Sequence, residues 1–200
     1  MPAYGYGDIE STLTMAKKNI DLALSLDVDT IITTCATCGS LLKRYPKLLS
    51  EDADYSTKAN TFSSRVKDIS EFLMDIGLNT EMGTLKYRVT YHDPCHLGRF
   101  QKVTSQPRQI LQSIPGVEFV EMAEPNMCCG AAGSYSLGHY DVSMKVLARK
   151  MENIAKTDAD LLVTCCPGCS MQLAHGVKEH RLKTRTKELV ELLDQAYQTT

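Results

Sequence analysis

The sequence predicts an α/β fold made of parallel βαβ units, and two observations lead to this prediction. Short apolar or β-branched runs, which are typical of strands, alternate along the chain with longer stretches in which apolar residues recur at helical spacing. The chain also has 200 residues, enough for one large domain or two small ones packed together around a real core. Strands separated by helices are typical of a parallel sheet.

The first part of the chain is expected to contain one strand among several helices. The β-branched run at 30–34 reads as a buried strand that ends at Cys35. The apolar spacing predicts helices at 9–26, at 39–49 with a break at Pro46, and at 62–74, followed by a loop at 77–83.

The second part is expected to alternate strands and helices more regularly. Strands are predicted at 85–91, 117–122 and 160–164. Helices are predicted at 107–114, 142–154, 169–180 and 186–197.

Charge and hydropathy exclude two classes of partner. The chain has 22 Lys and Arg against 24 Asp and Glu, a net charge of -2, and it has no run of five like charges, so it lacks the basic surface of a nucleic-acid-binding protein. Apolar runs such as 161–163 are far shorter than the roughly 20 residues of a membrane span. The N-terminus lacks the pattern of a signal peptide. We therefore expect a soluble, cytoplasmic chain with no nucleic-acid partner and at most peripheral membrane contact.

Eight cysteines are the most informative feature, because a reducing compartment retains thiols for metal binding, redox chemistry or catalysis. Each group of them follows a predicted strand. The carboxyl ends of parallel strands lie at one edge of a sheet, where ligands bind, so the groups are expected to converge there. The groups are Cys35 and Cys38; Cys95; Cys128 and Cys129; and Cys165, Cys166 and Cys169.

An internal repeat divides the chain. Residues 30–38 resemble residues 161–169, each a strand opened by Asp and followed by a C-x-x-C pair. The first copy has no counterpart of Cys95 or of the adjacent pair that begins at Cys128. We therefore interpret 1–84 as the C-terminal part of a first, truncated unit and 85–200 as a complete second unit.

The complete unit predicts an iron–sulfur site. A C-x-x-C turn presents two sulfurs to one centre, and Gly130 gives the backbone freedom that lets two adjacent cysteines face the same centre. Zinc takes four ligands and this unit offers more, which favours iron–sulfur over zinc. Zinc, a redox disulfide and uncoordinated thiols remain the alternatives. The candidate ligands are Cys95, Cys128, Cys129, Cys166 and Cys169.

The remaining candidates are less decisive. Cys35 and Cys38 form a C-x-x-C pair, but the other cysteines of their unit are missing. They are either a second metal site or unoccupied thiols. Cys165 is interpreted as a small buried apolar residue. His92 and His96 are candidates for metal ligands or hydrogen-bond donors to the sulfurs, although the favoured reading of both is a loop histidine positioned by Asp93.

The spacing of Cys95, Cys128-Cys129-Gly130 and Cys166-x-x-Cys169 resembles the cysteine-rich CCG domain of heterodisulfide reductase and its relatives, which carry two copies. Over nearly the whole chain the flanking residues also resemble the iron–sulfur subunit of glycolate oxidase (glycolate dehydrogenase), and lactate-utilisation iron–sulfur proteins share much of this pattern. The segments that carry the resemblance are 38–43, 65–73, 89–99, 107–108, 114–118, 128–135 and 167–173.

The resemblance implies a Rossmann-like fold of two pseudo-repeated CCG halves holding a [4Fe-4S] cluster, cubane or non-cubane. It implies an electron-transfer subunit of a flavin-dependent 2-hydroxy acid dehydrogenase that passes electrons from a flavin-containing subunit to quinone or another acceptor, in the cytoplasm or at the inner face of the cytoplasmic membrane. The alternatives are a catalytic chain that reduces a disulfide at its cluster, as in heterodisulfide reductase, or a lactate-utilisation protein. Cys166 departs from the glycolate type, in which this cysteine is often missing.

Overall fold

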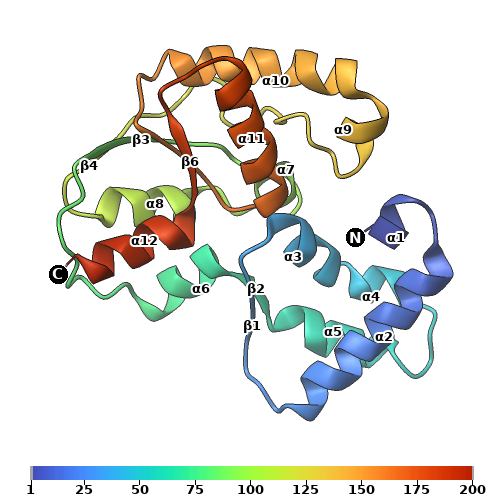
Figure 1. The fold of residues 1–200 in the computed structure, drawn as a ribbon. Coiled ribbons are helices and arrows are strands. Elements are labelled where there is room, and N and C mark those ends of the chain that lie inside the picture. Colours follow the sequence, from blue (N-terminus) through green and yellow to red (C-terminus); the bar gives the residue numbers. More distant parts are fainter. Residues whose placement is uncertain (1, 200) are drawn as a thin grey trace.

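The computed structural model describes residues 2–199 and contains two parallel sheets in that range (Figure 1). The smaller sheet pairs β1 (Ile31–Thr33) with β2 (Val66–Asp68), with Ile31 opposite Val66. The larger sheet has the order β4-β3-β5-β6 and is parallel throughout. Its strands are β3 (Tyr87–Tyr91), β4 (Val117–Phe119), β5 (Leu161–Thr164) and β6 (Arg185–Glu188). The predicted α/β class is confirmed.

Helices surround both sheets. Those of the first part are α1 (Pro2–Gly5), α2 (Ile9–Ser25), α3 (Ala36–Leu42), α4 (Tyr45–Leu48), α5 (Ser56–Ser64) and α6 (Ile69–Ile76). Those of the second part are α7 (Cys95–Gly98), α8 (Ser105–Ser113), α9 (Tyr135–Gly138), α10 (Tyr140–Ala155), α11 (Pro167–Glu179) and α12 (Leu189–Gln198). No helix within residues 2–199 is both long and apolar enough to cross a membrane.

The larger sheet is covered on two sides. Figure 1 shows α10 and α11 above it and α8 and α12 below it. Because β5 is flanked by β3 and β6 as well as by these helices, all of its residues are buried. A continuous apolar run such as Leu161-Leu162-Val163 is what a strand covered on both faces requires.

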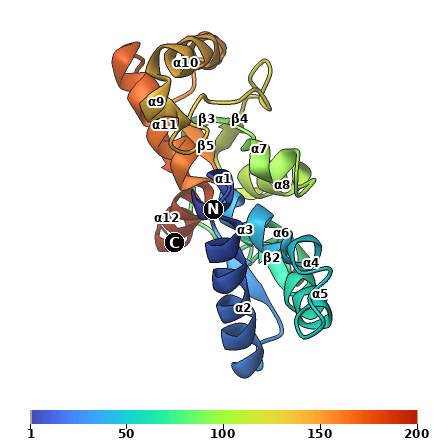
Figure 2. The same cartoon turned by 90° about the vertical axis from the view of Figure 1, so that its right-hand side faces the viewer.

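Two apolar clusters stabilise the chain. The smaller joins α2, α4 and α5 through residues such as Ile20, Tyr45 and Phe62. The larger surrounds the four-stranded sheet, and Leu73 and Met74 of α6 pack against it. Helix α6 thus connects the first part of the chain to the larger core. The turned view in Figure 2 shows α2, α4 and α5 at one end of the molecule and α9 and α10 at the other.

The predicted helix at 62–74 is wrong. Residues 66–68 form β2, which ends α5 at Ser64 and separates it from α6. Asp68 then starts α6 with a capping box, because its side chain accepts from the backbone N–H of Ser70 and the side chain of Glu71 accepts from that of Asp68. A strand of three residues interrupts helical spacing too briefly for periodicity to reveal it.

The last predicted helix also began too early. Residues 185–188 form the edge strand β6, and α12 starts only at Leu189, with a second capping box between Glu188 and Glu191. The strand predicted at 117–122 ends at Phe119, and the helix predicted at 39–49 is split into α3 and α4. The other predicted helices and strands are present with small shifts of their ends.

The internal repeat extends further than the cysteine pairs. Both halves contain, in the same order, a strand, a C-x-x-C helix, a second parallel strand, a capping box and a closing helix: β1, α3, β2 and α6, with α4 and α5 inserted before β2, and then β5, α11, β6 and α12. This shared order supports the division at 84/85, which we keep as a proposal.

Candidate metal centre

Both C-x-x-C pairs occupy the same positions of a helix. Cys35 and Cys166 are the N-cap residues of α3 and α11, and Cys38 and Cys169 lie in the first turn of those helices. The first turn of a helix has backbone N–H groups that it does not use and a partial positive charge, both of which favour thiolates. Pro167 at the start of α11 has no N–H to leave unsatisfied.

Cys95 is positioned by the end of β3. The backbone N–H of His92 donates to the carbonyl of Val163 on β5 over 2.9 Å, and the next N–H, of Asp93, donates to the carbonyl of Pro125 over 3.0 Å. The carboxylate of Asp93 is held by the guanidinium of Arg108 through two bonds of 2.8 Å. Cys95 then begins the short helix α7, with its position set by this partly buried ion pair.

Cys128 and Cys129 do not directly follow a strand, contrary to expectation. Eight residues lie between the end of β4 at Phe119 and Cys128. The loop returns to the sheet edge because other elements bind its backbone. The amine of Lys150 donates to the carbonyls of Glu124 (2.8 Å) and Pro125 (3.1 Å), and Arg99 donates to the carbonyl of Asn126 (3.0 Å).

Gly130 makes the turn that the adjacent cysteines need. Its φ is +90°, and a Cβ at this position would lie 2.6 Å from the carbonyl oxygen of Ser143. The hydroxyl of Ser143 donates to the carbonyl of Gly130 over 2.8 Å. The N–H of Gly130 in turn donates to the sulfur of Cys128 over 3.3 Å, so the turn also orients a thiol.

We expect Gly130→Ala to lower the free energy of unfolding by more than the roughly 1–2 kcal/mol that a left-handed backbone alone costs, because the added methyl group also meets the Ser143 carbonyl. Gly133→Ala is the matched control. Gly133 has a φ of +63° and open space where its Cβ would lie, so it carries the backbone cost without the clash. Chemical denaturation measures the free energy of unfolding of both variants. An equal loss in the two would contradict the predicted clash with the Ser143 carbonyl.

Seven of the eight cysteines form one continuous series of thiol contacts. Cys38 contacts Cys35, Cys35 contacts Cys166, and Cys166 contacts Cys169. Cys169 contacts Cys129, Cys129 contacts Cys128, and Cys128 contacts Cys95. The structure thus brings the five predicted ligands of the second half together. Cys35 and Cys38, the possible second site, join this series through the contact of Cys35 with Cys166.

The contacts divide the thiols into donors and acceptors. Hydrogen bonds from Cys129 and Cys95 lower the pKa of Cys128 to about 2, and hydrogen bonds from Cys169 and Cys35 hold the pKa of Cys166 well below its ordinary value. The contact with Cys128 raises the pKa of Cys129 to about 11. Contacts with Cys129 and Cys166 raise the pKa of Cys169.

Cys165 lies outside this series. Its side chain is 2% exposed and meets the hydroxyl of Tyr91, and burial holds the pKa of Cys165 well above its ordinary value. The backbone of Cys165 instead links the two halves, because its carbonyl accepts from the N–H of Ala36 over 3.2 Å. The thiol is protonated and packs as an apolar side chain.

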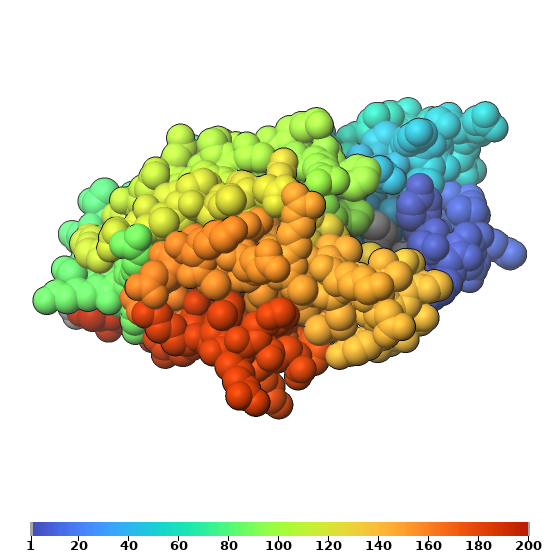
Figure 3. Space-filling model, turned by 90° about the horizontal axis from the view of Figure 1, so that it is seen from above, coloured from blue at the N-terminus to red at the C-terminus, as the bar shows by residue number. Residues whose placement is uncertain are grey.

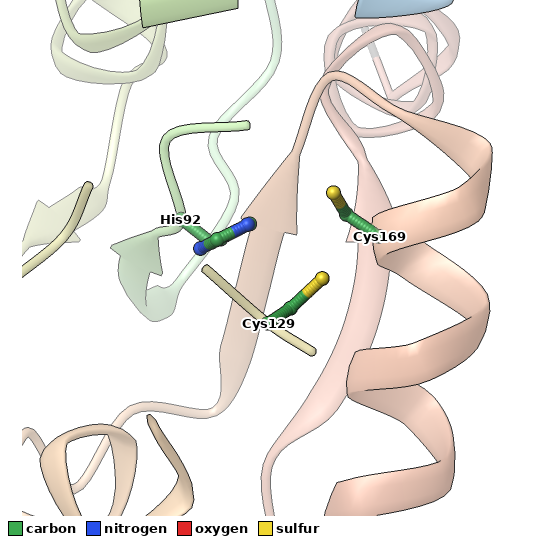
Figure 4. Close-up of side chains that lie close together, drawn as sticks. All are labelled: His92, Cys129 and Cys169. Atoms are coloured by element: carbon green, nitrogen blue, oxygen red, sulfur yellow. The ribbon is translucent and has the colours of Figure 1, made fainter. Parts of the chain in front are cut away.

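His92 is completely buried at the same sheet edge (Figure 4). One of its ring nitrogens and the sulfurs of Cys129 and Cys169 all lie within 4.8 Å of one another. Burial lowers the pKa of His92 to about 3, so the ring is neutral. Neither ring nitrogen forms a hydrogen bond in the described part of the chain, so the favoured sequence reading, a loop histidine positioned by Asp93, is wrong.

His96 has a different environment. Its Nδ1 lies 2.8 Å from the hydroxyl of Ser40 on α3, and its ring stacks on Phe100 with centroids 4.9 Å apart. Burial lowers the pKa of His96 as well. This side chain already has a partner and joins α7 to α3.

Lys150 was not among the residues that the sequence singled out. Its side chain is fully buried beneath the loop that carries Cys128 and Cys129, and burial lowers the pKa of Lys150 to about 8. No carboxylate pairs with it in the described range of residues; its amine contacts two carbonyls and the sulfur of Met122. A signal was present in the sequence, because Lys150 lies among buried residues at helical spacing: Ser143, Leu147, Met151 and Ile154.

Comparisons with known proteins agree with this arrangement. The profile of the cysteine-rich domain family (CCG) matches residues 2–43 and 89–174. The chain is 38% identical over 95% of its length to the probable glycolate oxidase iron-sulfur subunit of Bacillus subtilis (strain 168), of which it spans 44%. It is 32% identical over 91% of its length to one chain of the dihydromethanophenazine:CoB--CoM heterodisulfide reductase of Methanosarcina mazei, and it also spans 44% of that chain.

Another relative is lactate utilization protein A of Oceanobacillus iheyensis, which is 28% identical over 96% of this chain and of which the chain spans 79%. The chain thus covers less than half of the first two relatives and most of the third. The family match includes all seven contacting cysteines and extends over more than half of the chain. The chain therefore belongs to the cysteine-rich CCG domain family.

Proposed function

We propose that the chain holds an iron–sulfur centre at the edge of the larger sheet. The ligands would come from Cys95, Cys128, Cys129, Cys166 and Cys169, and the contact between Cys35 and Cys166 places a further thiol beside them. Thiolates are the donors that iron–sulfur clusters take from proteins. Among the residues that the structure describes, the ring of His92 has no hydrogen-bond partner and the amine of Lys150 has no carboxylate partner, and both suit an anionic metal centre nearby.

The chain then serves as the electron-transfer part of a flavin-dependent 2-hydroxy acid dehydrogenase, with glycolate as the substrate of the whole enzyme. An iron–sulfur centre accepts and releases single electrons, which suits a step between a flavin-containing subunit and quinone or another acceptor. The residues of this chain position the thiols, bury them and set the charge around them. The observation that carries the proposal is the continuous series of contacts among seven thiols, in a chain 38% identical to a glycolate oxidase iron-sulfur subunit.

The number of thiols favours a second candidate, a catalytic chain that reduces a disulfide at its cluster. A cubane takes four thiolates, and more than four sulfurs lie in contact here. An opened cluster would use the additional ones. The similarity to the heterodisulfide reductase of Methanosarcina mazei agrees with this candidate.

One experiment separates the two candidates. The anaerobically purified chain is reduced chemically and mixed with a water-soluble quinone analogue or with a small organic disulfide. The electron-transfer proposal predicts rapid reoxidation by the quinone and none by the disulfide. Reduction of the disulfide would instead favour the second candidate. A chain that contains zinc and takes up no electrons would contradict both candidates.

A further inference from the structure

His92 is a buried polar side chain whose ring nitrogens have no hydrogen-bond partner among residues 2–199. Its backbone is fixed, because its N–H donates to the carbonyl of Val163 and its carbonyl accepts from the hydroxyl of Thr164 over 3.3 Å. The ring is therefore held in place by β3 and β5 and not by a hydrogen bond of its own. Buried polar groups in native proteins are almost always satisfied, so the ring points to a partner that is not part of the chain.

The surroundings of the ring identify that partner as a metal. A ring nitrogen of His92 and the sulfurs of Cys129 and Cys169 lie within 4.8 Å of one another, and Figure 4 shows the three side chains approaching one space from three different segments. Two atoms that bind one metal over about 2.0–2.3 Å each lie within about 4.6 Å of each other. The three atoms are thus close to the arrangement of three ligands on one ion.

The rest of the ring also has the environment of a ligand. A histidine that binds a metal through one nitrogen usually donates the N–H of the other to a carbonyl or carboxylate. The carbonyl of Pro125 acts on the pKa of His92 in the direction opposite to burial, although it forms no hydrogen bond with the ring. That carbonyl is itself fixed by Lys150 and by the N–H of Asp93.

We propose that His92 is a nitrogen ligand of the metal centre, beside the sulfurs of Cys129 and Cys169. This inference rests on the proposed iron–sulfur function. It makes the donor set mixed, with one neutral nitrogen among thiolates. Histidine in place of cysteine raises the reduction potential of an iron–sulfur centre, because a neutral ligand adds no negative charge. His92 would accordingly make this centre easier to reduce than an all-thiolate one.

The direct test is pulsed electron paramagnetic resonance of the reduced chain, purified with ¹⁵N-labelled histidine. We expect a nitrogen coupling of the strength found for a bound imidazole. The coupling should persist in His96→Gln, which removes a neighbouring ring that bonds to Ser40, and disappear in His92→Cys. A coupling only as weak as that of a hydrogen-bonded nitrogen, or one that survives in His92→Cys, would overturn the assignment.

The variants provide a second readout. His92→Cys keeps a ligand atom and should retain iron while its midpoint potential becomes more negative, with a reduced fraction at least tenfold lower at the wild-type midpoint potential. His92→Phe should lose iron. Retention of iron and potential in His92→Phe would overturn the proposal. If neither variant folds, the wild-type spectrum decides alone. A chain without iron would contradict the proposed function, whereas an iron-containing chain without nitrogen coupling would contradict only the role of His92.

Discussion

Cys169→Ser is expected to remove most of the bound iron. Cys169 lies at the centre of the thiol series, in contact with both Cys129 and Cys166, and its sulfur belongs to the group that includes His92. Loss of an outer partner of a metal ligand already costs about 10–100-fold in affinity, and loss of a central thiolate should cost more. Iron and acid-labile sulfide per chain, measured after anaerobic purification, give the result.

Cys165→Ala is the matched control for this loss. Cys165 lies four residues before Cys169, but its thiol meets Tyr91 and packs in the core. Its removal leaves a small cavity that lowers stability by roughly 1 kcal/mol without removing a ligand. We expect Cys165→Ala to keep its iron. Equal iron content in the two variants, whether both full or both empty, would show that the series of contacts does not define the site.

Lys150→Met is expected to shift the midpoint potential of the centre to more negative values. The buried amine has no carboxylate partner among residues 2–199, and the thiols of Cys129 and Cys128 are among the groups that favour its charge. With a pKa of about 8, it is mostly protonated at pH 7. At an effective dielectric constant of about 20, two unit charges interact by about 4 kcal/mol at 4 Å and by less at longer range. We therefore expect the midpoint potential to shift by an amount on the order of 50–100 mV.

Arg149→Met controls for the loss of a positive charge from the same helix. The side chain of Arg149 is 64% exposed and pairs with Glu124 at the surface, where water screens its charge. Its removal should change the potential far less. A redox titration of the three proteins, normalised to their iron content, compares them. Similar shifts of the midpoint potential in the two variants would contradict a direct effect of the Lys150 charge on the centre. Lys150 would then act only through its hydrogen bonds to the loop that carries Cys128 and Cys129.

Much of the fold could be predicted because it depends on local patterns. The apolar strand β5 and the amphipathic helices α2 and α10 have a clear periodicity, and the order of strands and helices indicated parallel sheets. Strand β6 could not be predicted, because Arg-Thr-Lys-Glu is polar and becomes a strand only by pairing with β5 at the sheet edge. The three residues of β2 depend in the same way on pairing with β1.

The site followed from sequence only in part. The spacing of the cysteines and the freedom of Gly130 predicted which thiols of the second half gather. The contact of Cys35 with Cys166 could not be predicted, because it depends on how the two halves pack. Figure 3 shows how far apart in sequence the neighbouring segments are, with the N-terminal residues beside those near 135. Lys150 was not predicted at all, because its place on an apolar helix face becomes interpretable only once its burial is known.

The central claim, that these thiols hold an iron–sulfur centre, is tested most directly by the metal content and visible absorption of the full chain purified without oxygen. We predict a brown protein with about four iron and a similar amount of acid-labile sulfide per chain, whose broad absorption near about 400 nm bleaches on reduction. A colourless protein with about one zinc per chain and no labile sulfide would contradict the claim.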